Sequence, residues 1–158
     1  MDRFIIVDSH NSEYIGIIFH ILRKCGYNMA LTKRLFHWIP SYSKRNIRRD
    51  CQTKTVVLVW NEELNDYTST FQMYKNSDSS LYIRKIATLP QYEGKGIGKR
   101  NLLYIEQFAI KNGCSRICLD VYIKSKGAIS FYSHLGFKKV GTKRSIRFKE
   151  LIMKKQLD

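Results

Sequence analysis

Three glycines at alternate positions, Gly94, Gly96 and Gly98, stand between a β-type run and a helical pattern. A residue without a side chain lets the backbone approach a ligand closely, and successive amides at the start of a helix bind anions. Three cations, Lys95, Lys99 and Arg100, stand at the same end of the predicted helix. Because this end of the helix dipole is positive, cations there indicate an anionic partner rather than a purely structural turn. We therefore expect this turn to bind a pyrophosphate, with a tight turn chosen for geometry alone as the alternative.

Two common phosphate-binding motifs do not fit this turn. A nucleoside-triphosphate loop needs Gly-Lys followed by Ser or Thr, whereas Lys95 precedes Gly96 and Lys99 precedes Arg100. A dinucleotide-binding fold needs the glycine pattern G-x-G-x-x-G, but here the glycines alternate strictly, and too little chain follows Asp120 to complete such a sheet. The remaining design is a turn that holds the pyrophosphate of an acyl-coenzyme A.

Periodicity in the N-terminal part of the chain predicts a strand followed by helices. Residue types that cap helices follow a short β-type run, and apolar residues then recur at helical spacing. Glycine and proline stand where helices commonly end. The expected elements are a strand over 3–7, a helix over about 11–25 that stops at Gly26, and a second helix over 30–39 that ends at Pro40.

The rest of the chain predicts an α/β fold with a mixed, mostly antiparallel central sheet and flanking helices. Two β-type runs around a polar turn indicate an antiparallel hairpin, and the runs on either side of the helix after the glycines indicate one βαβ unit. No internal repeat or long linker divides the chain, so we expect a single domain. The expected elements are strands over 53–60, 67–74, 81–87 and 116–121, helices over 98–111 and 126–134, and a final strand pair over 137–140 and 151–155.

The chain is strongly basic, with 28 Lys and Arg against 13 Asp and Glu and a formal net charge of +15. Such a field attracts polyanions, although solvated faces of a basic protein explain it equally well. Part of the charge lies in a predicted basic amphipathic helix over 41–51, in which Ile47 faces away from four cations, Lys44, Arg45, Arg48 and Arg49. Nucleic acid could therefore contact the basic surface, but we do not expect this to be the main function.

Nothing in the sequence predicts export or a membrane partner. No apolar stretch approaches the ~18 residues of a membrane span, and the N-terminus lacks a basic region followed by an extended apolar core. We therefore expect a cytoplasmic protein. In that compartment the four cysteines should be reduced thiols, and without companion ligands at zinc spacing they predict no metal site.

Two segments of the sequence carry a family resemblance. The first is Glu93-Gly94-Lys95-Gly96-Ile97-Gly98, and the second is Ser125-Lys126-Gly127-Ala128-Ile129-Ser130-Phe131-Tyr132-Ser133-His134-Leu135-Gly136-Phe137. They are similar to two motifs of the GNAT superfamily of acetyl-CoA-dependent N-acetyltransferases: Gln/Arg-x-x-Gly-x-Gly/Ala after a strand, and Asn-x-x-Ala-x-x-Phe-Tyr-x-x-x-Gly-Phe. The resemblance covers about residues 67–156 well and residues 28–52 only loosely.

The resemblance implies one N-acetyltransferase domain over 1–158, with acceptor-side helices at about 11–52 and an acetyl-CoA-binding core at about 67–142. It also implies that strand 81–87 splays from strand 116–121, so that free backbone groups pair with the pantetheine arm. Acetyl-CoA is the implied cosubstrate, and no metal is implied. The implied cofactor-binding residues are Ile86, Ala87, Thr88, Glu93, Gly94, Lys95, Gly96, Ile97, Gly98, Lys99, Arg100 and Ser125.

Two positions depart from the family's pattern. Glu93 stands where Gln or Arg is usual, and its carboxylate lies close to the expected diphosphate unless it points into solvent. Ser125 replaces the usual Asn. Neither change removes the backbone amides of the turn, and the neighbouring cations offset the charge of Glu93.

Tyr132 stands at the family's position for the general acid. The departing thiolate comes from a thiol with an ordinary pKa near ~8.5 and benefits from a proton donor. The alternative is that the phenol only packs beside Phe131 and Phe137. No motif fixes the base that deprotonates the amine; the candidates are Glu13, Glu62, Glu63, Asp120 and His37.

The leading hypothesis is direct transfer of the acetyl group to a primary amine of a small molecule or a protein. A covalent route through Cys114 or Cys118 is disfavoured, because no base stands nearby in the sequence. The alternatives are a basic nucleic-acid-binding module and a CoA-binding sensor without turnover; a homodimer stays open. A cluster of aromatic residues predicts either an acceptor pocket or a hydrophobic contact face. The cluster consists of Phe36, His37, Trp38 and Tyr42.

Overall fold

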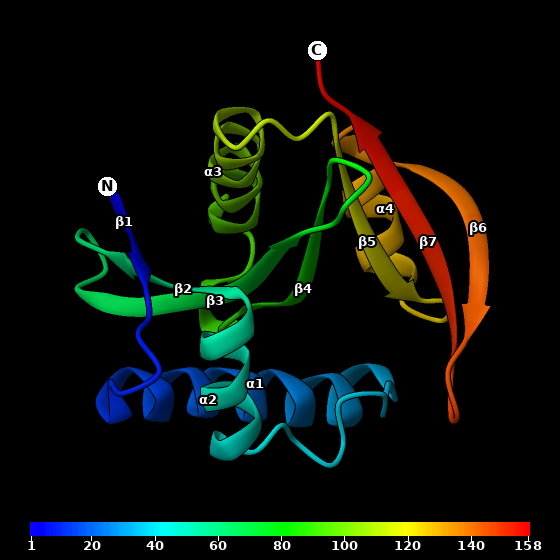
Figure 1. The fold of residues 1–158 in the computed structure, drawn as a ribbon. Coiled ribbons are helices and arrows are strands. Elements are labelled where there is room, and N and C mark those ends of the chain that lie inside the picture. The colour runs from blue at the N-terminus through cyan, green and yellow to red at the C-terminus, as the bar shows by residue number, and fades with distance from the viewer. The chain divides into compact units, whose positions relative to one another are not determined.

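The computed structural model describes all 158 residues, which form two compact units: Met1–Tyr74 with Lys85–Gly98, and Lys75–Arg84 with Lys99–Asp158. Seven strands form one sheet in the order β1-β2-β3-β4-β5-β7-β6, and the chain adds four α-helices and a short 3-10 helix (Figure 1). β4 and β5 pair in parallel, whereas β1 with β2, β2 with β3, β5 with β7 and β6 with β7 are antiparallel. The predicted mixed, mostly antiparallel sheet is confirmed; the single domain stays a prediction.

The first unit contains three antiparallel strands, β1 (Asp2–Ile6), β2 (Thr55–Asn61) and β3 (Asp66–Lys75), with two helices between β1 and β2 in the chain. β2 is rich in valine, which favours strands, and a polar turn leads from it into β3 as the sequence predicts. Side chains alternate along a strand, so Val56 and Leu58 share one side of β2. Both are completely buried on that side.

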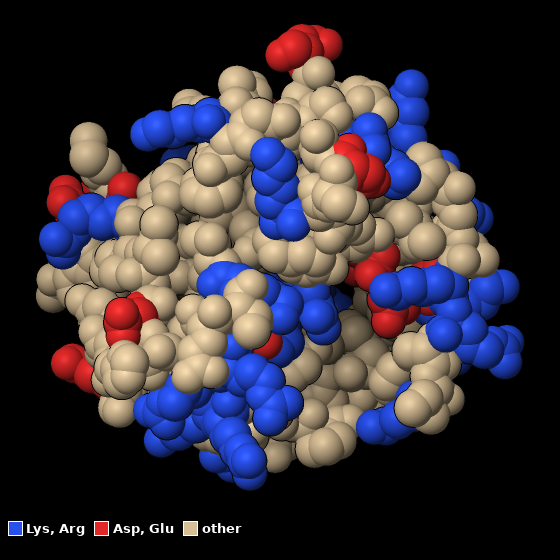
Figure 2. Space-filling view, in the orientation of Figure 1, with Lys and Arg blue, Asp and Glu red and all other residues tan.

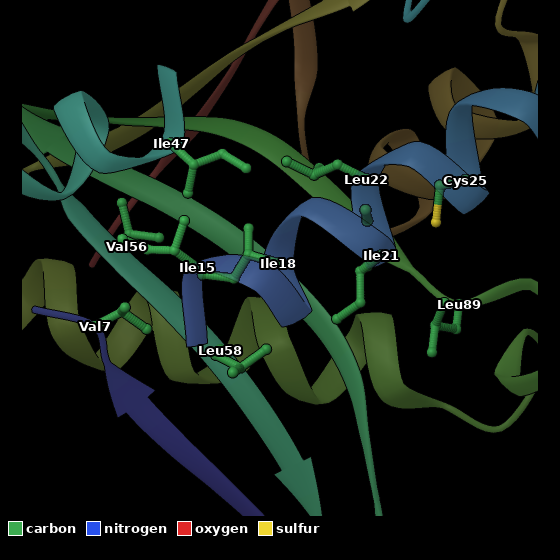
Figure 3. Packing of buried hydrophobic residues seen from close by; sticks show 11 residues of the cluster. Val7, Ile15, Ile18, Ile21, Leu22, Cys25, Ile47, Val56, Leu58 and Leu89 are labelled. Atoms are coloured by element: carbon green, nitrogen blue, oxygen red, sulfur yellow. The ribbon is translucent and has the colours of Figure 1, made fainter. Parts of the chain in front are cut away.

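Two helices, α1 (Ser12–Lys33) and α2 (Lys44–Thr53), supply the rest of this core (Figure 3). The apolar residues of α1 recur at helical spacing, which places them on one side of the helix. Burying one such side chain contributes about 1.5–3 kcal/mol, so the shared core holds both helices to β2. The cluster contains Val7, Ile15, Ile18, Ile21, Leu22, Cys25, Ile47, Val56, Leu58, Ala87 and Leu89.

The predicted end of the first helix is wrong. Asn11 caps the start of α1 as expected, but the helix continues through Gly26 and ends only where Arg34 adopts the left-handed conformation, with φ of 54°. The predicted second helix over 30–39 does not form. Its first residues belong to α1, and the remainder is irregular chain that leads to α2.

Gly26 serves close packing and does not end the helix. A Cβ at this position would lie 3.2 Å from the carbonyl oxygen of Trp38 and 3.3 Å from its Cβ. The chain that follows α1 therefore folds back against the helix at a residue without a side chain. Glycine inside a helix costs about 1 kcal/mol relative to alanine, and the close approach of Trp38 explains why it is tolerated here.

α2 is the predicted basic amphipathic helix. It begins at a capping box formed by Ser43 and Asn46, and Ile47 is completely buried on its inner side. Arg45 and Arg49 are exposed on the outer side, and neither has an acidic partner. Figure 2 shows a group of Lys and Arg side chains over α2.

The second unit is built around β5, which pairs with β4 on one side and with β7 on the other, while β6 forms the edge of the sheet. α3 connects β4 to β5, which confirms the predicted βαβ unit. Gly113 and Gly136 take left-handed conformations after α3 and α4, where the sequence predicts those helices to end. The elements are β4 (Ser80–Thr88), α3 (Ile97–Lys111), β5 (Arg116–Tyr122), α4 (Lys126–His134), β6 (Lys138–Arg144) and β7 (Lys149–Gln156).

All four cysteines are free thiols, and Cys25, Cys114 and Cys118 are buried. No three His, Cys, Asp or Glu residues lie close enough together to hold a metal ion. None of the helices combines the length and the apolar character that crossing a bilayer requires.

Candidate active site

The glycine turn joins a short 3-10 helix, η1 (Pro90–Tyr92), to the start of α3. Gly94 and Gly96 both adopt the left-handed conformation, with φ of 78° and 77°. A Cβ on Gly94 would meet nothing within 4 Å, so this position requires glycine for its backbone conformation and not for space. Left-handed residues that alternate with ordinary ones aim successive amides toward a common point, an arrangement that binds anions.

The amides of this turn are available to a ligand. The first amides of a helix have no partner within the helix, and no protein group accepts a hydrogen bond from the amides of Gly94, Gly96, Ile97 or Gly98. The turn itself is exposed, while the buried side chain of Ile97 anchors the start of α3. These amides can therefore donate together to a pyrophosphate at the positive end of the helix dipole.

The charged side chains of the turn are exposed, including the predicted contacts Lys95, Lys99 and Arg100. Glu93 is exposed as well, which favours the interpretation that its carboxylate points into solvent. Its charge still reaches α1: burial raises the pKa of the Cys25 thiol to about 12, and the negative charge of Glu93 adds to that shift.

The pairing between β4 and β5 ends early. It joins Ser80–Ile83 to Arg116–Leu119, although β4 runs on to Thr88 and β5 to Tyr122. This agrees with the splay that the resemblance implies, because the residues expected to meet the pantetheine arm lie beyond the last paired position of β4. Ile86 and Thr88 are half-buried there.

One of the expected backbone groups is already engaged. The thiol of Cys25 donates a hydrogen bond to the carbonyl oxygen of Thr88, with an Sγ–O distance of 3.2 Å. The next amide along the chain, that of Leu89, donates to the carbonyl of Thr68 at 2.8 Å. The end of β4 is thus held by α1 and β3, and a cosubstrate has to rely on the backbone of Ile86 and Ala87 more than on the carbonyl of Thr88.

Tyr132 lies on α4 and is only 9% exposed. Its ring makes edge contacts with Phe131 and Phe137, at centroid distances of 5.3 and 5.6 Å, so the packing expected of the alternative is present. The hydroxyl, however, has no hydrogen-bond partner in the protein, and burial alone raises the pKa of the phenol. The hydroxyl oxygen is not among the enclosed polar atoms that lack a partner, so a ligand can reach it although most of the ring is buried.

Ser125 occupies the N-cap position of α4, and its buried side chain makes no capping hydrogen bond. It stands seven residues before Tyr132, and two turns of helix bring such positions to one side. α4 therefore presents two hydroxyls on one side, and neither has a hydrogen-bond partner within the protein. Both are predicted site residues, and a bound ligand could supply their missing partners.

Three of the candidate bases lack the surroundings that a base requires. Glu62 pairs with Arg3 at 3.8 Å and Glu63 with the N-terminal ammonium at 3.3 Å, and both side chains are more than half exposed. Glu13 is exposed in the first turn of α1. His37 lies in the irregular chain after that helix, and burial lowers its pKa, which keeps the imidazole neutral.

Asp120, the fifth candidate, stands on β5 immediately after the last residue that pairs with β4. Its Oδ2 accepts a hydrogen bond from Lys143 at 2.5 Å, while its Oδ1 is buried without a partner. Burial raises the pKa of the neighbouring Glu150, and the charge of Asp120 raises it further. Figure 2 shows acidic atoms bordered by basic ones over β5 and β7.

The structure adds a buried ion pair that the sequence does not reveal, between Lys85 of β4 and Asp50 of α2. No motif contains either residue, and a lysine in a strand ordinarily marks a solvent-facing position. The only sequence signal is that Lys85 directly precedes the segment Ile86–Thr88.

The structure thus combines a parallel βαβ unit, a glycine turn with unused amides at the start of α3, and Tyr132 on α4, as the resemblance to coenzyme A-dependent acyltransferases implies. The acetyltransferase (GNAT) family matches residues 10–137, and the chain belongs to this family.

Known proteins agree with this assignment. The chain is similar to a thialysine N-epsilon-acetyltransferase of Mus musculus, with 35% identity over 57 residues, which are 36% of this chain and 34% of the relative. The match thus spans about a third of that protein. In fold, the chain is similar to the PaiA N-acetyltransferase of Thermoplasma acidophilum, solved in complex with coenzyme A, with a TM-score of 0.81, 18% identity and 99% of both chains covered. It is also similar to the ribosomal-protein-S18-alanine N-acetyltransferase of Escherichia coli, with a TM-score of 0.78, 16% identity and coverage of 100% of this chain and 95% of that one.

Proposed function

We propose that this GNAT-family acetyltransferase moves the acetyl group of acetyl-CoA directly to a primary amine. The nitrogen attacks the thioester carbonyl carbon, a C–N bond forms, the C–S bond breaks, and the amine loses a proton while the leaving thiolate gains one. The observation that carries the proposal is the set of unused amides at Gly94, Gly96, Ile97 and Gly98. Such a set at a helix start fits a diphosphate better than it fits a solvated turn.

The cosubstrate is held mainly by main-chain groups. The amides of the glycine turn bind the diphosphate, with Lys95, Lys99 and Arg100 supplying positive charge and Glu93 remaining a bystander in solvent. The backbone of Ile86–Thr88 pairs with the pantetheine arm beyond the end of the β4–β5 register. Ser125 offers its buried hydroxyl from the side of α4 that carries Tyr132.

Tyr132 is the general acid in this proposal. Its raised pKa keeps the phenol protonated throughout the neutral range, so the proton is always present for the thiolate. Its hydroxyl has no competing partner inside the protein. The acceptor or the thiolate thus completes the hydrogen bonding of this buried group.

Asp120 is the base, acting on the amine directly or through one water. Its unpartnered Oδ1 is the accepting atom, and Lys143 holds the other oxygen. An ordinary alkylammonium has a pKa near ~10 and is almost wholly protonated at neutral pH, so a base is required before attack.

A screen of primary amines tests this function. Release of free CoA is followed for small amines, polyamines and peptides, beside thermal unfolding with and without acetyl-CoA. Saturating cosubstrate should stabilise the protein, by about 2.7 kcal/mol at a hundredfold excess over Kd, and at least one amine should be acetylated. Stabilisation without turnover on any amine would instead favour a CoA-binding sensor.

The acceptor is proposed only as a primary amine. The names of the relatives give thialysine, at N-epsilon, as the acceptor in one case and an alanine of ribosomal protein S18 in another. The strong positive field of this chain disfavours a polycationic acceptor, because like charges repel. The cytoplasmic location, the absence of a metal requirement, a homodimer and nucleic-acid binding stay predictions, and steep weakening of RNA binding by salt would reveal the last of these.

A further inference from the structure

Lys85 has a backbone conformation that is rare inside a strand. Its φ is 49°, in the left-handed region, although it lies six residues into β4 and is not glycine. Such a conformation is strained for a residue with a side chain and departs from regular strand geometry. Lys85 stands directly before Ile86–Thr88, where the proposed function places the pantetheine arm.

The side chain of Lys85 is buried and fully engaged. Its Nζ lies 2.5 Å from Oδ2 of Asp50 and 4.1 Å from the ring centroid of Tyr42. Only 7% of the Lys85 side chain and 12% of the Asp50 side chain are exposed. Asp50 also accepts a hydrogen bond from Nε2 of Gln72 at 2.9 Å, and Lys54 lies 3.6 Å away.

These contacts tie Lys85 to three other parts of the first unit. Asp50 belongs to α2, Gln72 to β3, and Tyr42 to the chain between α1 and α2. The neighbourhood is also the one in which an aromatic acceptor group is expected, since Tyr42 and Trp38 are in ring contact at 6.0 Å.

Stability alone does not explain a buried pair of charges at this position. Removing two charges from water is costly, and a well-packed apolar pair is often as stable or more stable. Adding a strained backbone increases the cost. A pair kept under these conditions is better explained by the backbone geometry that it enforces.

We propose that Lys85 and Asp50 are positioning residues that hold the left-handed backbone conformation at Lys85, so that the backbone of Ile86–Thr88 faces the pantetheine arm in a productive geometry. This proposal rests on the proposed acetyl transfer. Neither side chain touches the reacting atoms. Misplacing a reactant by about 1 Å costs up to about 100-fold in rate, which sets the size of the expected effect.

Three variants test the proposal: Asp50→Asn, Lys85→Met, and the double variant Asp50→Leu with Lys85→Met. Each single change strands a buried polar or charged group and should lower the melting temperature, whereas the double change removes both charges and should restore much of it. All three should raise KM for acetyl-CoA and lower kcat/KM by about 10- to 100-fold. Hydrogen exchange at the amides of residues 86–88 should become faster in every variant.

The double variant separates positioning from mere stability. If its melting temperature and its acetyl-CoA kinetics both return to wild-type values, the pair is only structural and the proposal is overturned. If the double variant does not fold, the single variant Asp50→Asn decides. An unchanged KM for acetyl-CoA together with unchanged hydrogen exchange at residues 86–88 in that variant also overturns the proposal. Asp78→Asn, which breaks the exposed ion pair with Arg116, is the matched control and should leave both readouts unaltered.

The wild-type protein distinguishes this failure from a failure of the proposed function. Wild type should bind acetyl-CoA in calorimetry and release CoA in the presence of an acetylated amine. If wild type neither binds nor consumes acetyl-CoA, the proposed function is wrong, and so is the positioning proposal that rests on it. If wild type is active and the variants match it, only the positioning role is lost.

Discussion

At the residue scale, the proposed site consists of polar groups that have no hydrogen-bond partner within the protein. The Tyr132 and Ser125 hydroxyls share one side of α4, and Oδ1 of Asp120 is buried without a partner on β5. Burying a polar group without a hydrogen bond costs about 1–3 kcal/mol in proteins. In the proposed function, the acceptor amine supplies the missing partner of Oδ1 of Asp120.

Replacing Tyr132 with phenylalanine removes one hydroxyl and leaves the ring contacts in place. We expect kcat to fall by about 100-fold, because the thiolate then leaves without a positioned acid, with little change in KM or melting temperature. Because its pKa is raised, wild-type Tyr132 should also cause no loss of activity on the alkaline side up to about pH 10.

The matched control for this change is Tyr104→Phe, on α3. It removes a phenol hydroxyl from a half-buried tyrosine outside the proposed site. Steady-state kinetics of the two variants decide between the roles of Tyr132: equal activity of Tyr132→Phe and wild type would leave only the packing role.

Replacing Asp120 with asparagine should make the reaction depend on amine that is already deprotonated in solution. We expect a loss of at least about 100-fold at pH 7, and a rate that rises about tenfold per pH unit toward the pKa of the amine near ~10. A pH profile of kcat/KM for the acceptor measures this. Glu62→Gln should behave as wild type, and a parallel, undiminished profile for Asp120→Asn would exclude Asp120 as the base.

At the element scale, Gly94 in the glycine turn and Gly26 in α1 are required for opposite reasons. Gly94 has open space around its Cα but a left-handed backbone. Gly26 has ordinary helical geometry but no space beside Trp38. Substitution therefore has different consequences at the two positions.

Gly94→Ala should weaken cosubstrate binding while leaving the fold intact. A left-handed alanine is strained by roughly 1–2 kcal/mol, so the turn relaxes and its amides no longer converge on the diphosphate. We expect Kd for CoA to rise about tenfold in calorimetry, and binding of pantetheine, which lacks the diphosphate, to stay the same. An equal loss for both ligands would mean that the turn does not act through the diphosphate.

Gly26→Val should destabilise the protein without altering the turn. Overpacking of this kind costs about 1–3 kcal/mol, because the new side chain meets the backbone of Trp38 at 3.2 Å. Denaturant unfolding measures the loss. Gly16→Val is the control on the same helix, since its Cβ would meet nothing within 4 Å; equal losses for the two would refute the packing role of Gly26.

The sequence predicts a helix well where residues typical of helix ends stand at both its start and its end. The glycine turn and Gly113 frame α3, which is predicted over 98–111 and forms at Ile97–Lys111. The same reasoning fails at Gly26, because a glycine that admits a neighbouring chain looks identical in sequence to a glycine that ends a helix. The pair of Asp50 and Lys85 could not be predicted either, since 35 positions separate the residues and only the fold brings them together.

At the scale of the whole molecule, charge complements the proposed cosubstrate. The chain carries 28 Lys and Arg against 13 Asp and Glu, and several acids are already paired, such as Asp78 with Arg116. The remaining positive field speeds the encounter with an anion such as acetyl-CoA. Field strength does not select a ligand, however, so specificity has to come from the local geometry of the turn.

The binding of a diphosphate by the amides of the glycine turn is therefore measured most directly by NMR. In protein labelled with ¹⁵N-glycine, saturating CoA should shift the amide signals of Gly94, Gly96 and Gly98, and inorganic pyrophosphate alone should move the same three. Gly16 lies in α1 and Gly113 in the loop between α3 and β5, and neither should move. Unchanged turn signals at saturating CoA would contradict the account.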